Sequence, residues 1–247
     1  MNGLTVVSDA EYLAEEAVRR VVARGSAAVE ERGRFVVALA GGSTPKATYR
    51  RLAEETRVGR RHDADRIDWS RTEVFWGDER CVPPTDPDSN YRMARETLLD
   101  HVDIPAERVH RVRGEIPPAE GAAAYRRELA SVLGEQGRFD LILLGLGSDG
   151  HTASLFPGTP VVEERDKSAV AVFVQKLASW RITLTLPVIN RARHVFFLVS
   201  GARKAEALAR VQAGERLPAA FVRPGDGTLT WLVDQKAAGA LSSWDRG

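Results

Sequence analysis

Short apolar runs recur along the chain, and segments with apolar positions at helical spacing separate most of them. Such runs, bounded by polar or turn residues, predict buried strands, and the helical spacing predicts amphipathic helices. We expect strands at residues 4–7, 35–40, 72–76, 109–112, 139–144, 169–174, 182–186, 195–199 and 229–233. We expect helices at residues 10–31, 45–55, 91–100, 119–134, 202–211 and 235–241, and a helical turn at 187–192.

Strands that alternate with helices predict an α/β fold, with a mostly parallel sheet covered by helices on both faces. The chain of 247 residues is long enough for one large or two small domains of this class. Because no repeat, low-complexity tract or linker interrupts it, we expect a single domain over residues 1–247.

Composition narrows the class of protein. Hydrophobic residues make up 43% of the chain and charged residues 28%, as in ordinary soluble globular proteins. The net charge of +1 does not indicate a nucleic-acid or membrane surface. The apolar runs are too short to span a bilayer, and no apolar signal-peptide region opens the chain. The single cysteine, Cys81, excludes an internal disulfide, suits a reducing compartment and is expected to be a bystander, so we expect a cytoplasmic protein.

The candidate catalytic residues directly follow the strand expected at 139–144. The glycine-rich residues 145–151 follow, with Asp149 and His151 among the glycines. Open α/β sheets place their chemistry at the carboxyl ends of buried strands. The spacing also matches the dinucleotide fingerprint G-x-G-x-x-G, but that motif needs a long helix next, which residues 157–158 (Pro-Gly) would cut short. From these residues alone, His151 fits a structural loop histidine as well as a catalytic base.

A second glycine loop follows the strand at 35–40 and consists of Gly41, Gly42, Ser43 and Thr44. A strand, a glycine loop and a helix start form a ready anion site, especially for phosphate. The loop is not a Walker A motif, because G-x-x-x-x-G-K-[ST] is absent. A plain strand-to-helix turn with a capping hydroxyl is the alternative, and the loop alone leaves both interpretations open.

Three cationic side chains are candidate anion ligands. Arg80 follows a strand, and a guanidinium can pair two phosphate oxygens at once, although the spacing favours an ion pair with Asp78 or Glu79. Asp78 itself either acts in the site or orders its loop. Lys204 lies in the first turn of an expected helix, where a cation opposes the helix dipole, so it is either solvated or held by a bound anion. Arg181 precedes a strand and either contacts phosphate or only packs.

Several longer segments occur in a fixed order along the chain. They are AGGSTP (40–45), FWGDERCVP (75–83), PDSNYRMARETLL (87–99), LLGLGSDGHTASLFPG (143–158), WRITLTLPVIN (180–190) and SGARKAEAL (200–208). Together they resemble the 6-phosphogluconolactonase family over nearly the whole chain, and the set is far more specific than any one motif. The resemblance implies a modified Rossmann-like fold, shared with the glucosamine-6-phosphate deaminases, which also bind sugar phosphates.

The resemblance also assigns roles to individual residues. Carried over by motif, Asp149 and His151 are the reactive residues. The resemblance assigns phosphate binding to the 41–44 loop and Lys204, and the GDER segment (77–80) adds Arg80 to the residues that bind the substrate.

Two departures separate this chain from the deaminases. Their motif continues to a glutamate that supports ring opening and isomerisation, and Phe156 stands at that position here. Where they have M-D-E-Y, this chain has Gly-Asp-Glu-Arg at 77–80. Both departures favour the lactonase.

The resemblance implies hydrolysis of 6-phospho-D-glucono-1,5-lactone to 6-phosphogluconate, the second step of the oxidative pentose phosphate pathway. His151 would take a proton from the attacking water, and Asp149 would orient the imidazole or stabilise its cation. Backbone N–H groups of residues 147–150 would stabilise the oxyanion. We expect no metal or cofactor, because His151 with only Asp149 nearby lacks the three protein ligands of a catalytic zinc site.

Two other functions stay open: a sugar-phosphate isomerase or deaminase of the same fold, and a non-enzymatic sugar-phosphate sensor. The expected partner is a small sugar-phosphate lactone, with no nucleic acid or membrane, and the expected assembly is a monomer or small homo-oligomer. The remaining histidines lie in polar surroundings and are expected at the surface; they are His62, His101, His110 and His194.

Overall fold

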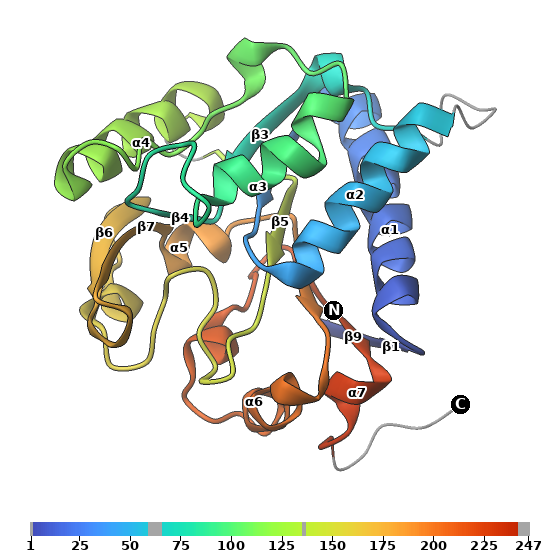
Figure 1. The fold of residues 1–247 in the computed structure, drawn as a ribbon, viewed down its shortest axis with the longest axis vertical. Coiled ribbons are helices and arrows are strands. Elements are labelled where there is room, and N and C mark those ends of the chain that lie inside the picture. The colour runs from blue at the N-terminus through green and yellow to red at the C-terminus, as the bar shows by residue number, and fades with distance from the viewer. Residues whose placement is uncertain (1, 59–65, 135–136, 242–247) are drawn as a thin grey trace.

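Six of the strands form one parallel sheet (Figure 1) in a computed structural model that describes residues 2–58, 66–134 and 137–241. The strands are β1 Asn2–Val7, β2 Phe35–Leu39, β3 Thr72–Trp76, β5 Leu141–Leu144, β8 His194–Val199 and β9 Thr228–Asp234. Their order is β1-β9-β8-β5-β2-β3, and every neighbouring pair is parallel. Every residue of β2, β3 and β5 is buried, as expected for strands covered on both faces. The predicted α/β class is confirmed.

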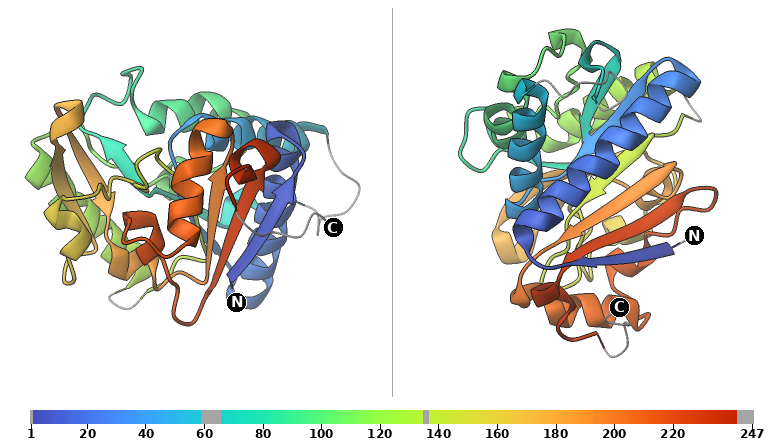
Figure 2. Two further views of the ribbon diagram at one scale, coloured as in Figure 1. Left: turned by 90° about the horizontal axis from the view of Figure 1, so that it is seen from below. Right: turned by 90° about the vertical axis from the view of Figure 1, so that its right-hand side faces the viewer.

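Helices flank this sheet (Figures 1 and 2). They are α1 Ala10–Arg32, α2 Ser43–Val58, α3 Asn90–Thr97, α4 Pro118–Leu133, α5 Leu186–Ile189, α6 Ala205–Gln212 and α7 Gln235–Ala238. The chain crosses the sheet in one direction from β1 through β2 to β3, and in the other direction from β5 through β8 to β9. Because crossovers between parallel strands are right-handed, α1 and α2 fall on one face and α6 on the other.

The two directions diverge between β2 and β5, which are neighbours in the sheet through the pair Ala38 and Ile142. At such a switch point, the loops that follow the two strands turn away from each other and leave a crevice at the carboxyl edge. The glycine-rich segments 41–44 and 145–151 follow these two strands, so both reach the same crevice.

A second sheet departs from the prediction. It contains β4 (Asp78–Arg80), β7 (Ser179–Leu184) and β6 (Ala169–Val174) in that order, and all pairs are antiparallel. The strands predicted at 169–174 and 182–186 therefore lie outside the parallel sheet, as a hairpin. A connection as short as residues 175–178 cannot hold the crossover that a parallel pair requires.

Other differences are local. Residues 109–112 form no strand, and only the first of them makes a parallel bridge, to Val74. The helix predicted from residue 45 begins at Ser43. The helix predicted from residue 202 begins as a 3-10 turn at Ala202–Lys204, and α6 follows that turn.

His110 is buried, contrary to the prediction. Its Nε2 lies 2.8 Å from Glu73 Oε2, and its Nδ1 lies 2.6 Å from Glu128 Oε1. Its partners are two glutamates distant in the sequence, so its polar neighbours along the chain do not indicate its exposure. The other histidines outside the glycine-rich loop are His101, which is exposed, His194, which is half-buried, and His62, which lies outside the described residues.

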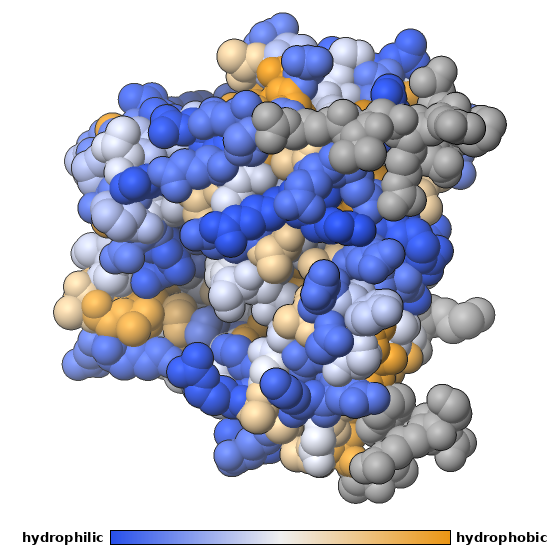
Figure 3. Space-filling view, turned by 45° about the vertical axis from the view of Figure 1, so that its right-hand side comes forward, coloured by the Kyte–Doolittle hydropathy of each residue, from blue (hydrophilic) through white to orange (hydrophobic). Residues whose placement is uncertain are grey.

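The face of the molecule in Figure 3 is largely hydrophilic, with small hydrophobic areas. The β6–β7 hairpin holds three of the exposed large apolar side chains, Phe173, Leu177 and Trp180. Within the described ranges, no helix is both long and apolar enough to cross a membrane.

The buried carboxylate of Glu79 fastens the start of α3 to β4. It accepts hydrogen bonds from the backbone N–H groups of Arg80, Asn90 and Tyr91, each at 2.7 Å, and from Ser89 Oγ at 3.1 Å. Burial raises the pKa of Glu79, while the amide donors act in the opposite direction. The side chain therefore satisfies N–H groups that a helix start would otherwise leave unpaired.

We expect Glu79→Ala to lower the free energy of unfolding by about 3 kcal/mol, because it leaves several buried donors without a partner. Urea unfolding of both proteins followed by circular dichroism measures this difference. The exposed Glu107 supplies a matched control, and Glu107→Ala should change stability by less than about 0.5 kcal/mol. Equal stability of the two variants would contradict the capping role of Glu79.

Candidate active site

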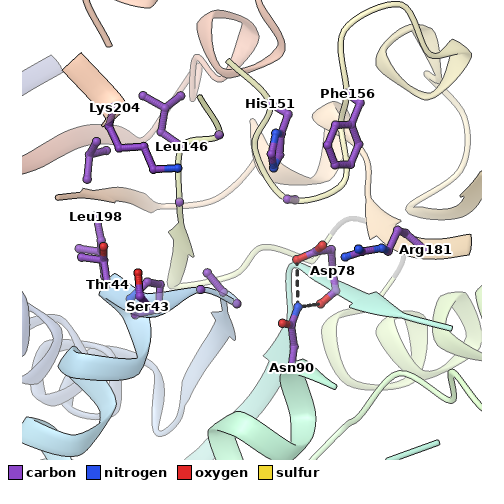
Figure 4. A pocket seen from close by; sticks show the side chains of 18 of the residues that line it. Ser43, Thr44, Asp78, Asn90, Leu146, His151, Phe156, Arg181, Leu198 and Lys204 are labelled. Carbon is purple, nitrogen blue, oxygen red and sulfur yellow. Dashed lines mark hydrogen bonds between the residues drawn. The ribbon is translucent and has the colours of Figure 1, made fainter. Parts of the chain in front are cut away.

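An open cleft of about 440 Å³ lies at the carboxyl edge of the parallel sheet (Figure 4). Residues that follow β2, β3, β5 and β8 line it, so it occupies the switch point. All but one of the site residues predicted from the sequence line this cleft: Gly41, Gly42, Ser43, Thr44, Asp78, Arg80, His151, Arg181 and Lys204. The exception is Asp149, which lies behind His151 and lines a neighbouring hollow.

The imidazole of His151 is held by two contacts. Its Nδ1 lies 2.5 Å from Asp149 Oδ1, and its ring stacks on Phe156 with centroids 4.1 Å apart. Because Nδ1 faces a carboxylate, the neutral ring carries its hydrogen there and leaves Nε2 free to accept a proton. Burial lowers the pKa of His151 below the usual value, and the hydrogen bond to Asp149 opposes that shift. The neutral ring is therefore the favoured form at pH 7.

The carboxylate of Asp149 contacts two side chains, those of His151 and Lys176. Its Oδ2 forms an ion pair with Lys176, which lies on the turn between β6 and β7. Burial opposes its charge, but the hydrogen bonds from Lys176 and His151 outweigh burial and hold the pKa of Asp149 well below its usual range. The carboxylate is thus ionised throughout the neutral pH range.

Gly147 allows the imidazole to fold back against its own loop. A Cβ at this position would lie 2.0 Å from His151 Nδ1, so a larger residue does not fit. The Gly147 N–H donates to the His151 carbonyl at 2.8 Å, and the Gly150 N–H donates to the Gly147 carbonyl at 3.0 Å. The prediction that the N–H groups of residues 147–150 stabilise an oxyanion is therefore wrong for Gly147 and Gly150. The N–H groups of Ser148 and Asp149 stay candidates for this role.

The loop after β2 forms one corner of the cleft, with backbone geometry suited to an anion. Gly42, at a φ of +106° that favours glycine, accepts the first helical hydrogen bond of α2 from the N–H of Lys46 at 3.1 Å. The N–H groups of Ser43 and Thr44, at the start of the helix, have no helical acceptor, so they and the helix dipole favour an anion. Lys204, half-buried on the turn after β8, lies on the same side of the cleft (Figure 4).

Two arginines lie on the other side of the cleft. Arg80 and Arg181 are register partners across the antiparallel pair of β4 and β7. In the part of the chain that the structure describes, the buried Nε atoms of both have no hydrogen-bond partner, while Arg80 Nη1 donates to the Asp88 carbonyl. Burial lowers the pKa of Arg181, and the charge of Arg80 adds to that effect. A bound phosphate or carboxylate would satisfy both guanidinium groups.

The carboxylate of Asp78 is occupied by neighbours rather than by Arg80. It accepts a hydrogen bond from Ser154 Oγ at 2.6 Å. Asn90 Nδ2 donates to the Asp78 carboxylate at 3.3 Å and to the Asp78 carbonyl at 2.9 Å (Figure 4). These bonds join β4, α3 and the segment after His151. Of the two roles considered for Asp78, the geometry supports the ordering of its loop.

Three polar residues of the site were missed by the sequence reasoning. Asn90 and Ser154 lie inside recognised segments, but nothing in their spacing shows that both bind Asp78. Lys176 carries no sequence signal, because only the fold brings it to Asp149. The bystander role of Cys81 agrees with its environment, since burial raises the pKa of the thiol to about 11 and keeps it protonated.

No group of three or more His, Cys, Asp or Glu side chains that could hold a metal ion occurs among the described residues. The chemistry available in the cleft is thus a neutral imidazole beside a carboxylate, with cationic and N–H groups on two sides.

Comparison with known proteins agrees with this arrangement. Residues 8–231 match the family model described as glucosamine-6-phosphate isomerases/6-phosphogluconolactonase. The chain is 43% identical to a 6-phosphogluconolactonase of Synechocystis sp., over 94% of this chain and 95% of that protein. It is 41% identical to one of Nostoc sp., over 96% and 97%. The structure of 6-phosphogluconolactonase from Trypanosoma cruzi superposes with a TM-score of 0.84 at 31% identity, covering 98% of each chain.

Proposed function

The chain belongs to the glucosamine-6-phosphate isomerase/6-phosphogluconolactonase family, and from this premise we propose that it hydrolyses 6-phospho-D-glucono-1,5-lactone to 6-phosphogluconate. One observation carries the proposal: His151, whose Nδ1 faces Asp149, lines a cleft with cationic groups on both sides. This reaction is the second step of the oxidative pentose phosphate pathway. The single cysteine suits a reducing compartment, and we place the reaction in the cytoplasm.

His151 is the general base of the proposed mechanism. Its free Nε2 takes a proton from water as the water oxygen attacks the lactone carbonyl carbon. The tetrahedral oxyanion that forms is stabilised by the remaining loop amides and the cations of the cleft. When the bond between that carbon and the ring oxygen breaks, the imidazolium returns the proton to the ring oxygen, and the ring opens to the hydroxy acid. Asp149 fixes the tautomer and stabilises the transient imidazolium.

The phosphate of the substrate lies away from the reacting carbonyl, and we assign it to the corner formed by the 41–44 loop and Lys204. An N–H-rich helix start with a lysine is suited to a dianion. The Arg80–Arg181 pair then faces the other end of the substrate, where negative charge develops at the carbonyl and ends as the product carboxylate. Binding energy from the phosphate end positions the lactone for attack.

Isomerisation or deamination of a sugar phosphate is the second function open to this family. Those reactions need a further acid or base near the substrate ring. The position that would supply a glutamate holds Phe156, which is buried and stacks on His151. An apolar ring in contact with the base favours hydrolysis.

We expect the protein to accelerate loss of 6-phosphogluconolactone and to convert no glucosamine 6-phosphate. The lactone is generated in situ at slightly acidic pH, where spontaneous hydrolysis is slow, and its loss is followed with and without EDTA. Acceleration that survives EDTA supports metal-free hydrolysis, and acceleration lost with EDTA would contradict the metal-free mechanism. Conversion of glucosamine 6-phosphate without lactone hydrolysis would favour the isomerase. Binding without turnover of either would favour the sensor.

A further inference from the structure

Lys176 occupies a position that the proposed mechanism does not yet use. It lies on the 3-10 turn Gln175–Leu177 of the β6–β7 hairpin, 27 residues beyond Asp149 in the chain. Its ammonium group bonds Asp149 Oδ2, while His151 Nδ1 lies 2.5 Å from Oδ1. The same carboxylate is therefore divided between an ammonium group and the imidazole.

A third side chain packs against both partners of Asp149. Lys176 Nζ lies 4.7 Å from the centroid of the Phe156 ring, and that ring stacks on the imidazole of His151. The cation–π contact helps to hold the ammonium in place. Lys176 thus has two anchors, and both are groups that also position the base.

We propose that Lys176 is a positioning residue for His151: by sharing Asp149 it limits how strongly that carboxylate stabilises the imidazolium, and so keeps the base neutral at lower pH. A carboxylate beside an imidazole favours the protonated ring. An ammonium group on the other oxygen partly cancels the negative potential that the carboxylate produces at the ring. It also repels the imidazolium directly.

The other charges near His151 do not depend on Lys176. Asp78 favours the imidazolium together with Asp149, and Lys176 opposes both. The remaining charged groups that line the cleft with His151 are Arg80, Arg181 and Lys204. Because these come from β4, β7 and the turn after β8, removal of the Lys176 ammonium leaves them in place.

The test is an NMR pH titration of the His151 imidazole. The chain has only five histidines, and His151→Gln assigns the signal. We expect the native midpoint below the usual value of about 6.5 and a midpoint at higher pH in Lys176→Met. Lys176→Arg should restore the native midpoint, and Lys167→Met, which removes an exposed lysine outside the cleft, should leave it unchanged. An unchanged or lower midpoint in Lys176→Met would overturn the proposal.

Kinetics supply the second readout. In Lys176→Met, kcat/KM at pH 6 should fall roughly three- to tenfold, with recovery by pH 7.5 and little change in KM. A large rise in KM with an unmoved His151 midpoint would make Lys176 a substrate ligand instead, and would overturn the positioning role. The role inferred for Lys176 in catalysis rests on the proposed function, in which His151 is the base. The NMR titration, however, requires no turnover. A shifted midpoint in a protein without lactonase activity would therefore remove the proposed function and leave the Lys176–Asp149–His151 coupling in place.

Discussion

Replacement of His151 by alanine is expected to lower kcat/KM for the phospholactone by roughly 10²- to 10⁴-fold, the range that general-base catalysis supplies. Among the described residues, His151 supplies the only imidazole that lines the cleft, so the variant loses the proposed acceptor for the water proton. Some acceleration should persist, because the cleft still binds the lactone and stabilises its oxyanion. Loss of lactone measured at pH 6–7, after subtraction of the spontaneous rate, gives the effect.

His101 provides the matched control for this substitution, since it is exposed and its ring contacts the Glu96 carbonyl, outside the cleft. His101→Ala should retain native kcat/KM. Competitive inhibition by 6-phosphogluconate should persist in His151→Ala, which would show that the cleft is intact. Native activity in a folded His151→Ala would leave the lactonase function standing and remove His151 as its base.

Replacement of Lys204 by methionine is expected to raise KM for the phospholactone by roughly 10- to 100-fold, with a smaller effect on kcat. The ammonium is half-buried beside a helix start, so its contact with a phosphate is worth more than an exposed ion pair. Because the phosphate is remote from the reacting carbon, most of the lost energy should appear in binding. Initial rates over a range of lactone concentrations separate the two constants.

The neighbouring residue gives the control for Lys204. Arg203 lies on the same turn but is exposed and does not line the cleft, so Arg203→Met should keep the native KM. With unphosphorylated gluconolactone, Lys204→Met and the native protein should be nearly equal. An equal loss on both lactones would show that Lys204 does not contact the phosphate.

The parallel sheet and most of the cleft could be predicted from the sequence because their signals are local. The apolar runs of β2 and β5 are continuous, and the glycine loops after these strands mark the carboxyl edge. Once parallel pairing is assumed, the residues after these strands must meet. This argument brings His151 and the 41–44 loop to one edge of the sheet, whereas the choice of Lys204 came from the family motif.

The missed features depend on long-range pairing. The three residues of β4 are all charged, and they form a strand only because β7 pairs with them. His110 looks solvated in the sequence but is buried between two glutamates from separate elements. Lys176 reaches Asp149 only because the β6–β7 hairpin folds over the loop after β5. No window of sequence contains both members of such pairs.

The cross-strand placement of Arg80 and Arg181 has a consequence for biosynthesis. A ribosome that has completed the chain through β5 has already made Arg80 and the 41–44 loop, but neither Arg181 nor Lys204 exists yet. The two sides of the cleft that we propose bind the anionic groups of the substrate each combine an early and a late segment. We therefore expect that a nascent chain cannot bind the substrate until β8 and the turn after it have emerged. Premature termination anywhere before that turn yields a product without lactonase function, however well its first strands have paired.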